Sequence, residues 1–204
     1  MNHIITVSRE FGSGGRELAQ QMAEKLGYQY YDKEIIAEMV KNSKFDESYI
    51  ENVAKINTKD FPYAISKNIA LYSAHQKQTT EILVLEKKMI KQLAEKGNCV
   101  FVGRCADIIL REYNPLNIFV YADTETKIKR CQENSTQNVN LSDKELVKGM
   151  KEIDKARKNH CFLLGIDNWG AKENYHLCVN TSGSEIKDLV SMITSYAKAY
   201  FQVV

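Results

Sequence analysis

A glycine-rich turn between an apolar run and an amphipathic segment is the feature that most constrains the fold of this chain. Residues 8–17 read SREFGSGGRE, the apolar residues 4–7 precede them, and apolar side chains recur on one face of residues 16–26. This pattern predicts a strand over 4–7, a tight turn, and a helix over about 16–26 that ends at Gly27. A short strand at 28–31 follows, and its pairing with the first strand is expected to be parallel.

The glycines of the turn indicate a phosphate-binding loop. They let backbone N–H groups approach a phosphate closely, and the N-terminus of the following helix adds partial positive charge. The strict phosphate-loop pattern ends in Gly-Lys-Ser/Thr, whereas this loop ends in Gly15, Arg16 and Glu17. Arg16 either contacts the phosphate or is a solvated residue of the first helical turn. Glu17 suits the helix dipole and would need a metal ion between itself and a polyphosphate.

The rest of the chain continues the alternation of strands and helices. Further apolar runs predict strands at 99–102, 116–120 and 175–179. Helices are expected over 33–41, about 63–96, from 104 to about 113, after Thr124, from Ser142 onward through a capping box, and over 184–201. Five strands alternating with helices predict an α/β doubly wound sheet. Residues 42–62 are polar and show no regular apolar pattern, which indicates a mobile or inserted segment.

Size and composition favour one soluble domain over residues 1–204. The chain has 204 residues, a net charge of only +2, and no apolar stretch near the roughly 18 residues of a membrane span. We therefore expect neither a nucleic-acid nor a membrane partner, and no signal peptide is visible. The five cysteines are odd in number and lack CxxC spacing, which favours reduced core thiols in a cytoplasmic protein.

Polar residues that directly follow predicted strands are candidates for ligand contact, because ligands bind at the carboxyl ends of parallel strands. Asp32 follows the second strand and either caps the next helix or contacts a ligand. Arg104 follows the third, and its planar guanidinium suits bidentate contact with a phosphate or a base. Asp123 and residues 180–182 follow the last two strands.

Two basic clusters lie on either side of the polar segment 132–141. Each is either an exposed helix face or part of a closing lid, since phosphoryl transfer depends on positioned cations. Their members are Lys127, Lys129 and Arg130 in the first, and Lys151, Lys155, Arg157 and Lys158 in the second.

Several strings of the sequence, spread over nearly the whole chain, resemble the cytidylate kinase-like family of P-loop proteins. They lie at residues 8–17, 31–36, 102–107, 154–157 and 169–170. The resemblance implies a P-loop NTPase-type three-layer fold with a five-stranded parallel sheet, a helical insert at approximately 42–80 and a lid at approximately 130–158. It also implies use of ATP and Mg²⁺.

The resemblance implies a role for each candidate residue. The loop that holds the donor triphosphate comprises Gly12, Ser13, Gly14, Gly15, Arg16 and Glu17. Asp32 and Arg104 would face the acceptor nucleotide, while Arg16, Arg130 and Arg157 would neutralise phosphates during catalysis. Cytidylate kinases keep a loop Lys followed by Ser or Thr. Here the Lys position falls on Gly15 or on Arg16, and no hydroxyl follows.

These observations leave two main hypotheses for function. The first is an ATP-dependent phosphotransferase of the nucleoside monophosphate kinase type, acting on CMP or a related small acceptor. The second is a regulatory module that binds a nucleotide or phosphometabolite without kinase turnover, which the missing Lys favours. A purely structural protein would leave the glycine loop and the arginines after the strands unexplained. The long helix at 63–96 could also bury an apolar stripe against a second copy of the chain.

Overall fold

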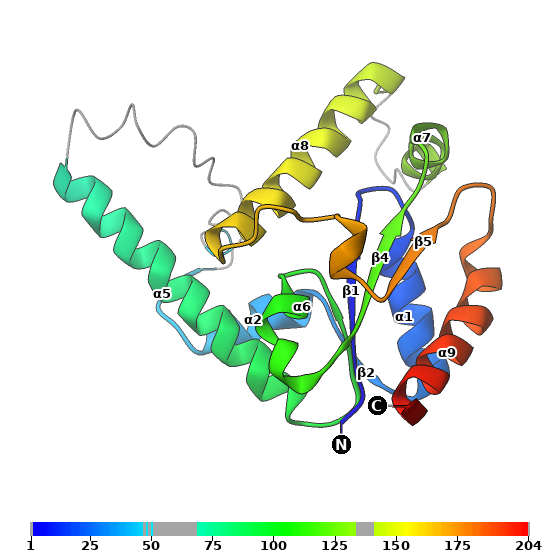
Figure 1. The fold of residues 1–204 in the computed structure, drawn as a ribbon. Coiled ribbons are helices and arrows are strands. Elements are labelled where there is room, and N and C mark those ends of the chain that lie inside the picture. Colours follow the sequence, from blue (N-terminus) through cyan, green and yellow to red (C-terminus); the bar gives the residue numbers. More distant parts are fainter. Residues whose placement is uncertain (1, 47, 49, 51–68, 134–140, 204) are drawn as a thin grey trace.

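The computed structural model describes residues 2–46, 48, 50, 69–133 and 141–203 (Figure 1). Within these residues, five strands form one parallel sheet in the order β2-β3-β1-β4-β5. The strands are β1 (Ile4–Arg9), β2 (Gln29–Tyr31), β3 (Cys99–Val102), β4 (Leu116–Tyr121) and β5 (Leu177–Asn180). The predicted five-stranded parallel sheet is confirmed. The expected pairing of the first two strands is wrong, because β3 lies between β1 and β2 and pairs with both.

Helices cover both faces of the sheet and produce three layers (Figure 1). Within the described residues, the α-helices with their bounds are α1 (Gly15–Leu26), α2 (Lys33–Lys41), α5 (Ile69–Ala94), α6 (Ala106–Ile109), α7 (Thr124–Glu133), α8 (Asp143–Leu163) and α9 (Ile186–Val203). Short 3₁₀ turns lie at η2 (Arg111–Tyr113) and η3 (Lys172–Asn174). Helices α1 and α9 pack on one face, and α2, α5 and α6 pack on the other.

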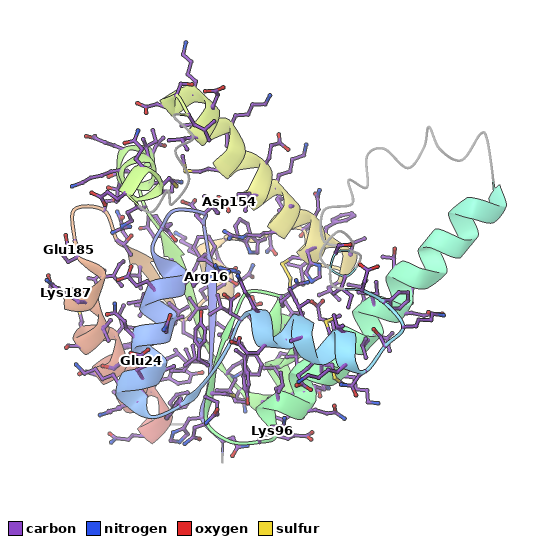
Figure 2. The ribbon with its side chains drawn as sticks, turned by 180° about the vertical axis from the view of Figure 1, so that it is seen from behind. Arg16, Glu24, Lys96, Asp154, Glu185 and Lys187 are labelled. Atoms are coloured by element: carbon purple, nitrogen blue, oxygen red, sulfur yellow. A yellow bond between two sulfur atoms is a disulfide. The ribbon has the colours of Figure 1, made fainter. Side chains whose placement is uncertain are left out.

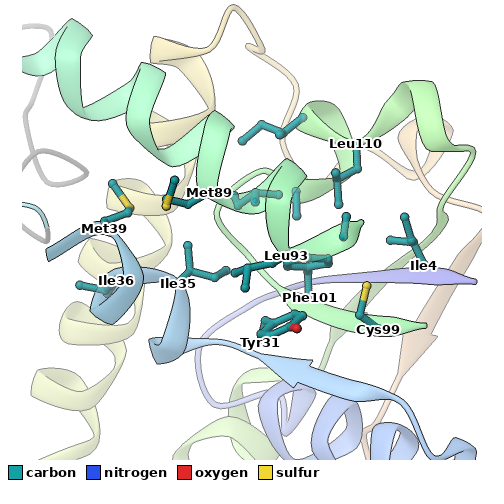
Figure 3. Close-up of a cluster of buried hydrophobic side chains, with 14 of the residues drawn as sticks. Ile4, Tyr31, Ile35, Ile36, Met39, Met89, Leu93, Cys99, Phe101 and Leu110 are labelled. Atoms are coloured by element: carbon teal, nitrogen blue, oxygen red, sulfur yellow. The ribbon is translucent and has the colours of Figure 1, made fainter. Parts of the chain in front are cut away.

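Alternation along the central strands divides the core into two clusters. Ile5 and Val7 face α1 and α9, whereas Ile4 faces α2, α5 and α6. Figure 3 shows the cluster on the face covered by α2, α5 and α6, in which the rings of Tyr31 and Phe101 pack with their centroids 5.1 Å apart. Because both faces of β1 and β3 are covered, these strands are continuous apolar runs, as is typical of buried parallel strands.

Most helix ends lie where the sequence indicates. Gly27, in the left-handed conformation, ends α1, and Ser142 and Glu145 form the predicted capping box of α8. The helix expected from 104 to about 113 is instead divided into α6 and η2. Arg104 and Cys105 have positive φ values and form a turn that delays the helix. Residues 51–68 of the predicted insert and 134–140 of the predicted lid lie outside the described residues.

Candidate active site

A cavity of about 300 Å³ lies at the carboxyl ends of β1 and β3. Its walls come from the ends of these strands, the starts of α1 and α2, and one face of α8. Its charged side chains are those of Arg9, Arg16, Asp32, Lys33, Arg104 and Arg157, with His160 beside them. Five cations around one carboxylate indicate a site for an anionic ligand, and the volume is at the lower end of the range of small-molecule pockets.

The glycine loop leads from β1 into α1 beside this cavity. Gly12 and Gly14 have φ values of +77° and +76°, which favour glycine, and the buried Ser13 hydroxyl donates to the Glu10 carbonyl at 2.8 Å. Within the described residues, the N–H groups of Gly14, Gly15 and Arg16 have no hydrogen-bond acceptor. The loop therefore presents free amide donors at a helix N-terminus, as anion-binding loops do.

Arg16 and Asp32 are brought together by the fold. Nε of Arg16 lies 2.6 Å from Oδ2 of Asp32, and the Asp32 side chain is 13% exposed. Asp32 occupies the N-cap position of α2, but its side chain makes no capping hydrogen bond. Its carboxylate instead faces the arginines of the cavity. Glu17 accepts a hydrogen bond from Gln21 at 2.9 Å and lies exposed on α1.

Arg104 is held from behind by a buried carboxylate. Its Nη1 lies 3.2 Å from Oε1 of Glu86, a wholly buried residue of α5, and Oε2 of Glu86 lies 2.8 Å from Nε2 of His160. Burial by itself raises the pKa of Glu86, but the adjacent His160 and Arg104 lower it below its ordinary value. Glu86 therefore remains ionised and fixes Arg104 at the cavity wall.

A disulfide joins Cys105, in the turn after β3, to Cys161 near the end of α8. Their Cα atoms are 5.9 Å apart, although 56 residues separate them in sequence. The expectation of reduced thiols is therefore wrong for this pair, because the fold brings together two cysteines whose spacing carries no signal. Cys99, Cys131 and Cys178 are free. The bond attaches α8 to the loop that carries Arg104.

Arg157 and Asp154 connect α8 to the glycine loop. Nη1 of Arg157 donates to the Arg9 carbonyl at 2.8 Å and to Oδ1 of Asp154 at 2.9 Å. The same Asp154 oxygen accepts the N–H of Phe11 at 2.9 Å. In the rear view of Figure 2, Arg16 lies at the start of α1 and Asp154 on α8 above it. The described part of the predicted lid thus already contacts the loop.

Arg130 lies behind the loop and is not among the cavity-lining residues. Its guanidinium donates to the carbonyl oxygens of Ser13, Thr181 and Ser184 and to the Thr181 hydroxyl, at 2.8–3.1 Å. These bonds clamp the glycine loop to the segment between β5 and α9. The structure therefore separates the two arginines expected in the lid: Arg157 reaches the cavity, and Arg130 supports the loop from outside.

Reasoning from sequence missed Arg9 and His160, which line the cavity, and Glu86, which is buried behind Arg104. The sequence does indicate that Glu86 is buried, because this residue lies four positions after Ile82 on the apolar face of its helix. A carboxylate at a buried helical position needs a partner. Arg9 ends β1 and so belongs with the other residues that directly follow strands.

The fold and the site together define a kinase-like protein of the α/β P-loop class. The sequence profile of the Cytidylate kinase-like family matches residues 4–183, and the chain belongs to this family. The cytidylate kinase of Clostridium botulinum (strain Loch Maree / Type A3) is 24% identical, over 97% of this chain and 99% of that protein. The cytidylate kinase of Archaeoglobus fulgidus is 23% identical, over 93% and 91% respectively.

Solved structures agree with this fold. An uncharacterized protein from Eubacterium ventriosum superposes with a TM-score of 0.67 at 28% identity, covering 96% of this chain and 98% of that one. Shikimate kinase from Bacteroides thetaiotaomicron superposes with a TM-score of 0.53 at 15% identity, covering 97% and 99%. The second similarity concerns the fold alone. Among the described residues, no helix is long and apolar enough to cross a membrane.

Proposed function

We propose that this protein transfers a phosphoryl group from ATP to CMP or a related small nucleotide, in the cytoplasm. The observation that carries the proposal is the free amides of the glycine loop beside a cavity with five cationic side chains. In the reaction, an acceptor phosphate oxygen forms a bond to the γ-phosphorus. The bond from that phosphorus to the β–γ bridging oxygen breaks, and ADP leaves with the electron pair.

The loop amides of Gly14, Gly15 and Arg16 would bind the donor phosphates, supported from behind by Arg130. Arg104 and Arg157 would bind the acceptor phosphate from the opposite walls of the cavity. Catalysis of phosphoryl transfer is mostly positioning and stabilisation of charge, which fixed guanidinium groups provide. Asp32 would both orient Arg16 and face the acceptor.

The donor set fits a magnesium ion that is carried mainly by the phosphates. Among the described residues, no three His, Cys, Asp or Glu side chains gather where they could hold a metal ion. Mg²⁺ commonly binds through one or two carboxylates together with substrate phosphates and water, and Glu17 and Asp32 supply carboxylates beside the loop. When bound, the ion would neutralise phosphate charge.

A second candidate function is a regulatory module that binds a nucleotide or phosphometabolite without kinase turnover. It is favoured by the absence of the Lys and the Ser or Thr that end a conventional loop: Gly15 or Arg16 stands at the Lys position, and no hydroxyl residue follows. The location is a separate question: the Cys105–Cys161 disulfide argues against a cytoplasmic location, because thiols are normally kept reduced in the cytoplasm. The proposed partner in either case is a small phosphorylated molecule.

Release of ADP from Mg–ATP, measured with each nucleoside monophosphate in turn, tests the proposal. We expect release that depends on one acceptor and that falls about 10- to 100-fold in Arg104→Met, the range for hydrogen bonds to a charged group. Arg111→Met, which alters an exposed arginine of η2, is the matched control. ATP binding with no acceptor-dependent ADP release would favour the regulatory module. Absence of ATP binding would contradict the proposed kinase function.

A further inference from the structure

The aliphatic part of the Arg9 side chain fills the space that a side chain at position 15 would need. A Cβ atom added to Gly15 would lie 2.6 Å from the Cβ of Arg9 and 3.1 Å from the Cβ of Val120. Real Cβ atoms do not approach so closely, so the first residue of α1 must be glycine while Arg9 is present. The glycine at position 15 and the arginine at position 9 are sterically coupled.

The guanidinium group of Arg9 extends from the glycine loop to the turn after β3. Gly103 has a φ value of +71°, and a Cβ atom added there would collide with Nη1 of Arg9. Two glycines, one on each side, therefore leave room for this single side chain. The guanidinium ends in the cavity, between the loop and the strand end that leads to Arg104.

Arg9 is the least neutralised of three neighbouring arginines. Arg16 pairs with Asp32 at 2.6 Å, and Arg157 pairs with Asp154 at 2.9 Å. The ion pair of Arg9 within the described residues is a 3.9 Å contact with the same Asp32. Its side chain is only 14% exposed, so little water compensates its charge. Three guanidinium groups against two carboxylates leave a surplus positive charge.

The charge of Arg9 persists at neutral pH. Burial, together with the adjacent Arg157, lowers the pKa of Arg9 to about 9. Even at that value the guanidinium is protonated at pH 7. A largely buried cation without a close counter-ion is costly, and an anion bound in the cavity would remove that cost.

The spacing of the loop explains why the cation is at this position. In the conventional pattern Gly-x-x-x-x-Gly-Lys, taking Gly14 as the second glycine places the first glycine at Arg9 and the Lys at Gly15. Relative to that pattern, the glycine and the cation have exchanged positions. The guanidinium approaches the space above the loop from the strand side instead of from the helix.

Resting on the proposed function, we infer that Arg9 is the phosphate-binding cation of this loop and replaces the missing lysine. Its position between the loop and the acceptor wall suits contact with the phosphoryl group that passes between donor and acceptor. An arginine offers a planar fork of donors to phosphate oxygens, which a lysine does not. A lysine is therefore not required for this loop to bind a triphosphate.

Isothermal titration of the full chain with Mg–ATP tests the inference. Arg9→Met keeps the length of the stem but removes the charge, and Arg111→Met is the control at an exposed arginine. We expect Arg9→Met to weaken Mg–ATP binding about 10- to 100-fold, the range for hydrogen bonds to a charged group, and the control to bind like the wild type. Circular dichroism would check the fold of each variant.

A double variant separates loss of the cation from loss of the fold. Arg9→Gly combined with Gly15→Lys restores the conventional spacing and removes the collision with Arg9 at position 15, so that only the 3.1 Å approach to the Cβ of Val120 must be accommodated. We expect it to bind Mg–ATP within about 10-fold of the wild type, less than the loss expected from removing the charge. Gly15→Lys alone is expected to be destabilised.

The possible outcomes distinguish a failure of the inference about Arg9 from a failure of the proposed function. If the wild type binds Mg–ATP and a folded Arg9→Met binds it equally well, Arg9 is not the phosphate-binding cation and the proposed function stands. If Arg9→Met does not fold, the double variant decides: retained binding supports the inference, and lost binding in a folded protein overturns it. If the wild type does not bind Mg–ATP, the proposed function itself fails.

Discussion

Oδ2 of Asp32 lies 2.6 Å from Nε of Arg16, which joins the start of α2 to the start of α1 across the mouth of the cavity. The carboxylate also lies 3.9 Å from Arg9. Asp32 is thus the shared counter-charge of two arginines that flank the glycine loop, Arg9 at the end of β1 and Arg16 in the first turn of α1. A bound phosphate would compete with it for both, so the affinity of the site for anions depends on this one side chain.

Replacing Asp32 by asparagine is expected to strengthen the binding of a simple anion. The change leaves Arg9 and Arg16 without their shared counter-charge. We expect pyrophosphate to bind about 3-fold more tightly, a modest gain because Arg16 is exposed enough for solvent to screen it. Titration calorimetry at low salt measures the effect, with Asp167→Asn as the control at an exposed acidic residue. Weaker pyrophosphate binding would show that Asp32 positions the arginines more than it neutralises them.

Replacing Glu86 by glutamine is expected to destabilise the protein. The carboxylate is wholly buried and pairs with both Arg104 and His160. Breaking such a buried pair costs about 3–5 kcal/mol. Glu112→Gln, at a solvent-exposed pair with Lys91, should change the stability little, because solvent screens exposed ion pairs. Urea unfolding at pH 7 compares the two variants. Equal stability of Glu86→Gln and the wild type would mean that the charge of Glu86 contributes nothing to the fold.

Asp107 should give the protein an unusual pH dependence. Burial raises the pKa of Asp107 to about 6, although backbone N–H groups at Asp107 and Ile108 act in the opposite direction. A folded-state pKa above the unfolded value means that the proton binds the folded protein more tightly. The stability from this group is therefore present below about pH 4 and lost as the pH rises through about 6.

Asp107→Asn tests this dependence because it keeps the shape of the side chain and removes the titration. The variant should gain about 2–3 kcal/mol relative to the wild type at pH 7 and little at pH 4, because the pKa of Asp107 rises from 3.8 to about 6 on folding. Urea unfolding at both pH values measures the difference. A constant difference between the two proteins from pH 4 to pH 7 would contradict a raised pKa for Asp107.

Opening the disulfide should weaken the attachment of α8. The bond between Cys105 and Cys161 closes a loop with a sequence separation of 56 residues. Its loss in a Cys105→Ser, Cys161→Ser double variant should cost roughly 2–4 kcal/mol under oxidising conditions. Dithiothreitol should destabilise the wild type by a similar amount and leave the double variant unchanged. Alkylation of the denatured, unreduced wild type at all five cysteines would show that the bond is absent.

The layers of the fold could be predicted from the sequence because their signals are local. The apolar runs at 4–7 and 99–102 mark strands buried on both faces, and Ser142 with Glu145 marks the start of α8. The candidate site depends on contacts between segments far apart in sequence. Asp32 and Arg104 follow their strands and reach the cavity, as the parallel sheet requires.

The partners of these residues were beyond sequence reasoning. Arg130 and Arg157 have the same chemistry and both belong to the predicted lid, yet one binds the back of the loop and the other lines the cavity. Which face of a helix meets the loop depends on the packing of α7 and α8, and the composition of each helix does not encode it. The same holds for the pairing of Cys105 with Cys161.

The central claim is that this site transfers a phosphoryl group between nucleotides. The most direct measurement is ³¹P nuclear magnetic resonance of the protein with Mg–ATP and CMP, following the appearance of CDP together with ADP. We expect the two products to accumulate in equal amounts and neither to form when CMP is omitted. Unchanged ATP and CMP in the presence of protein shown to bind both would contradict phosphotransfer to CMP and favour a binding function.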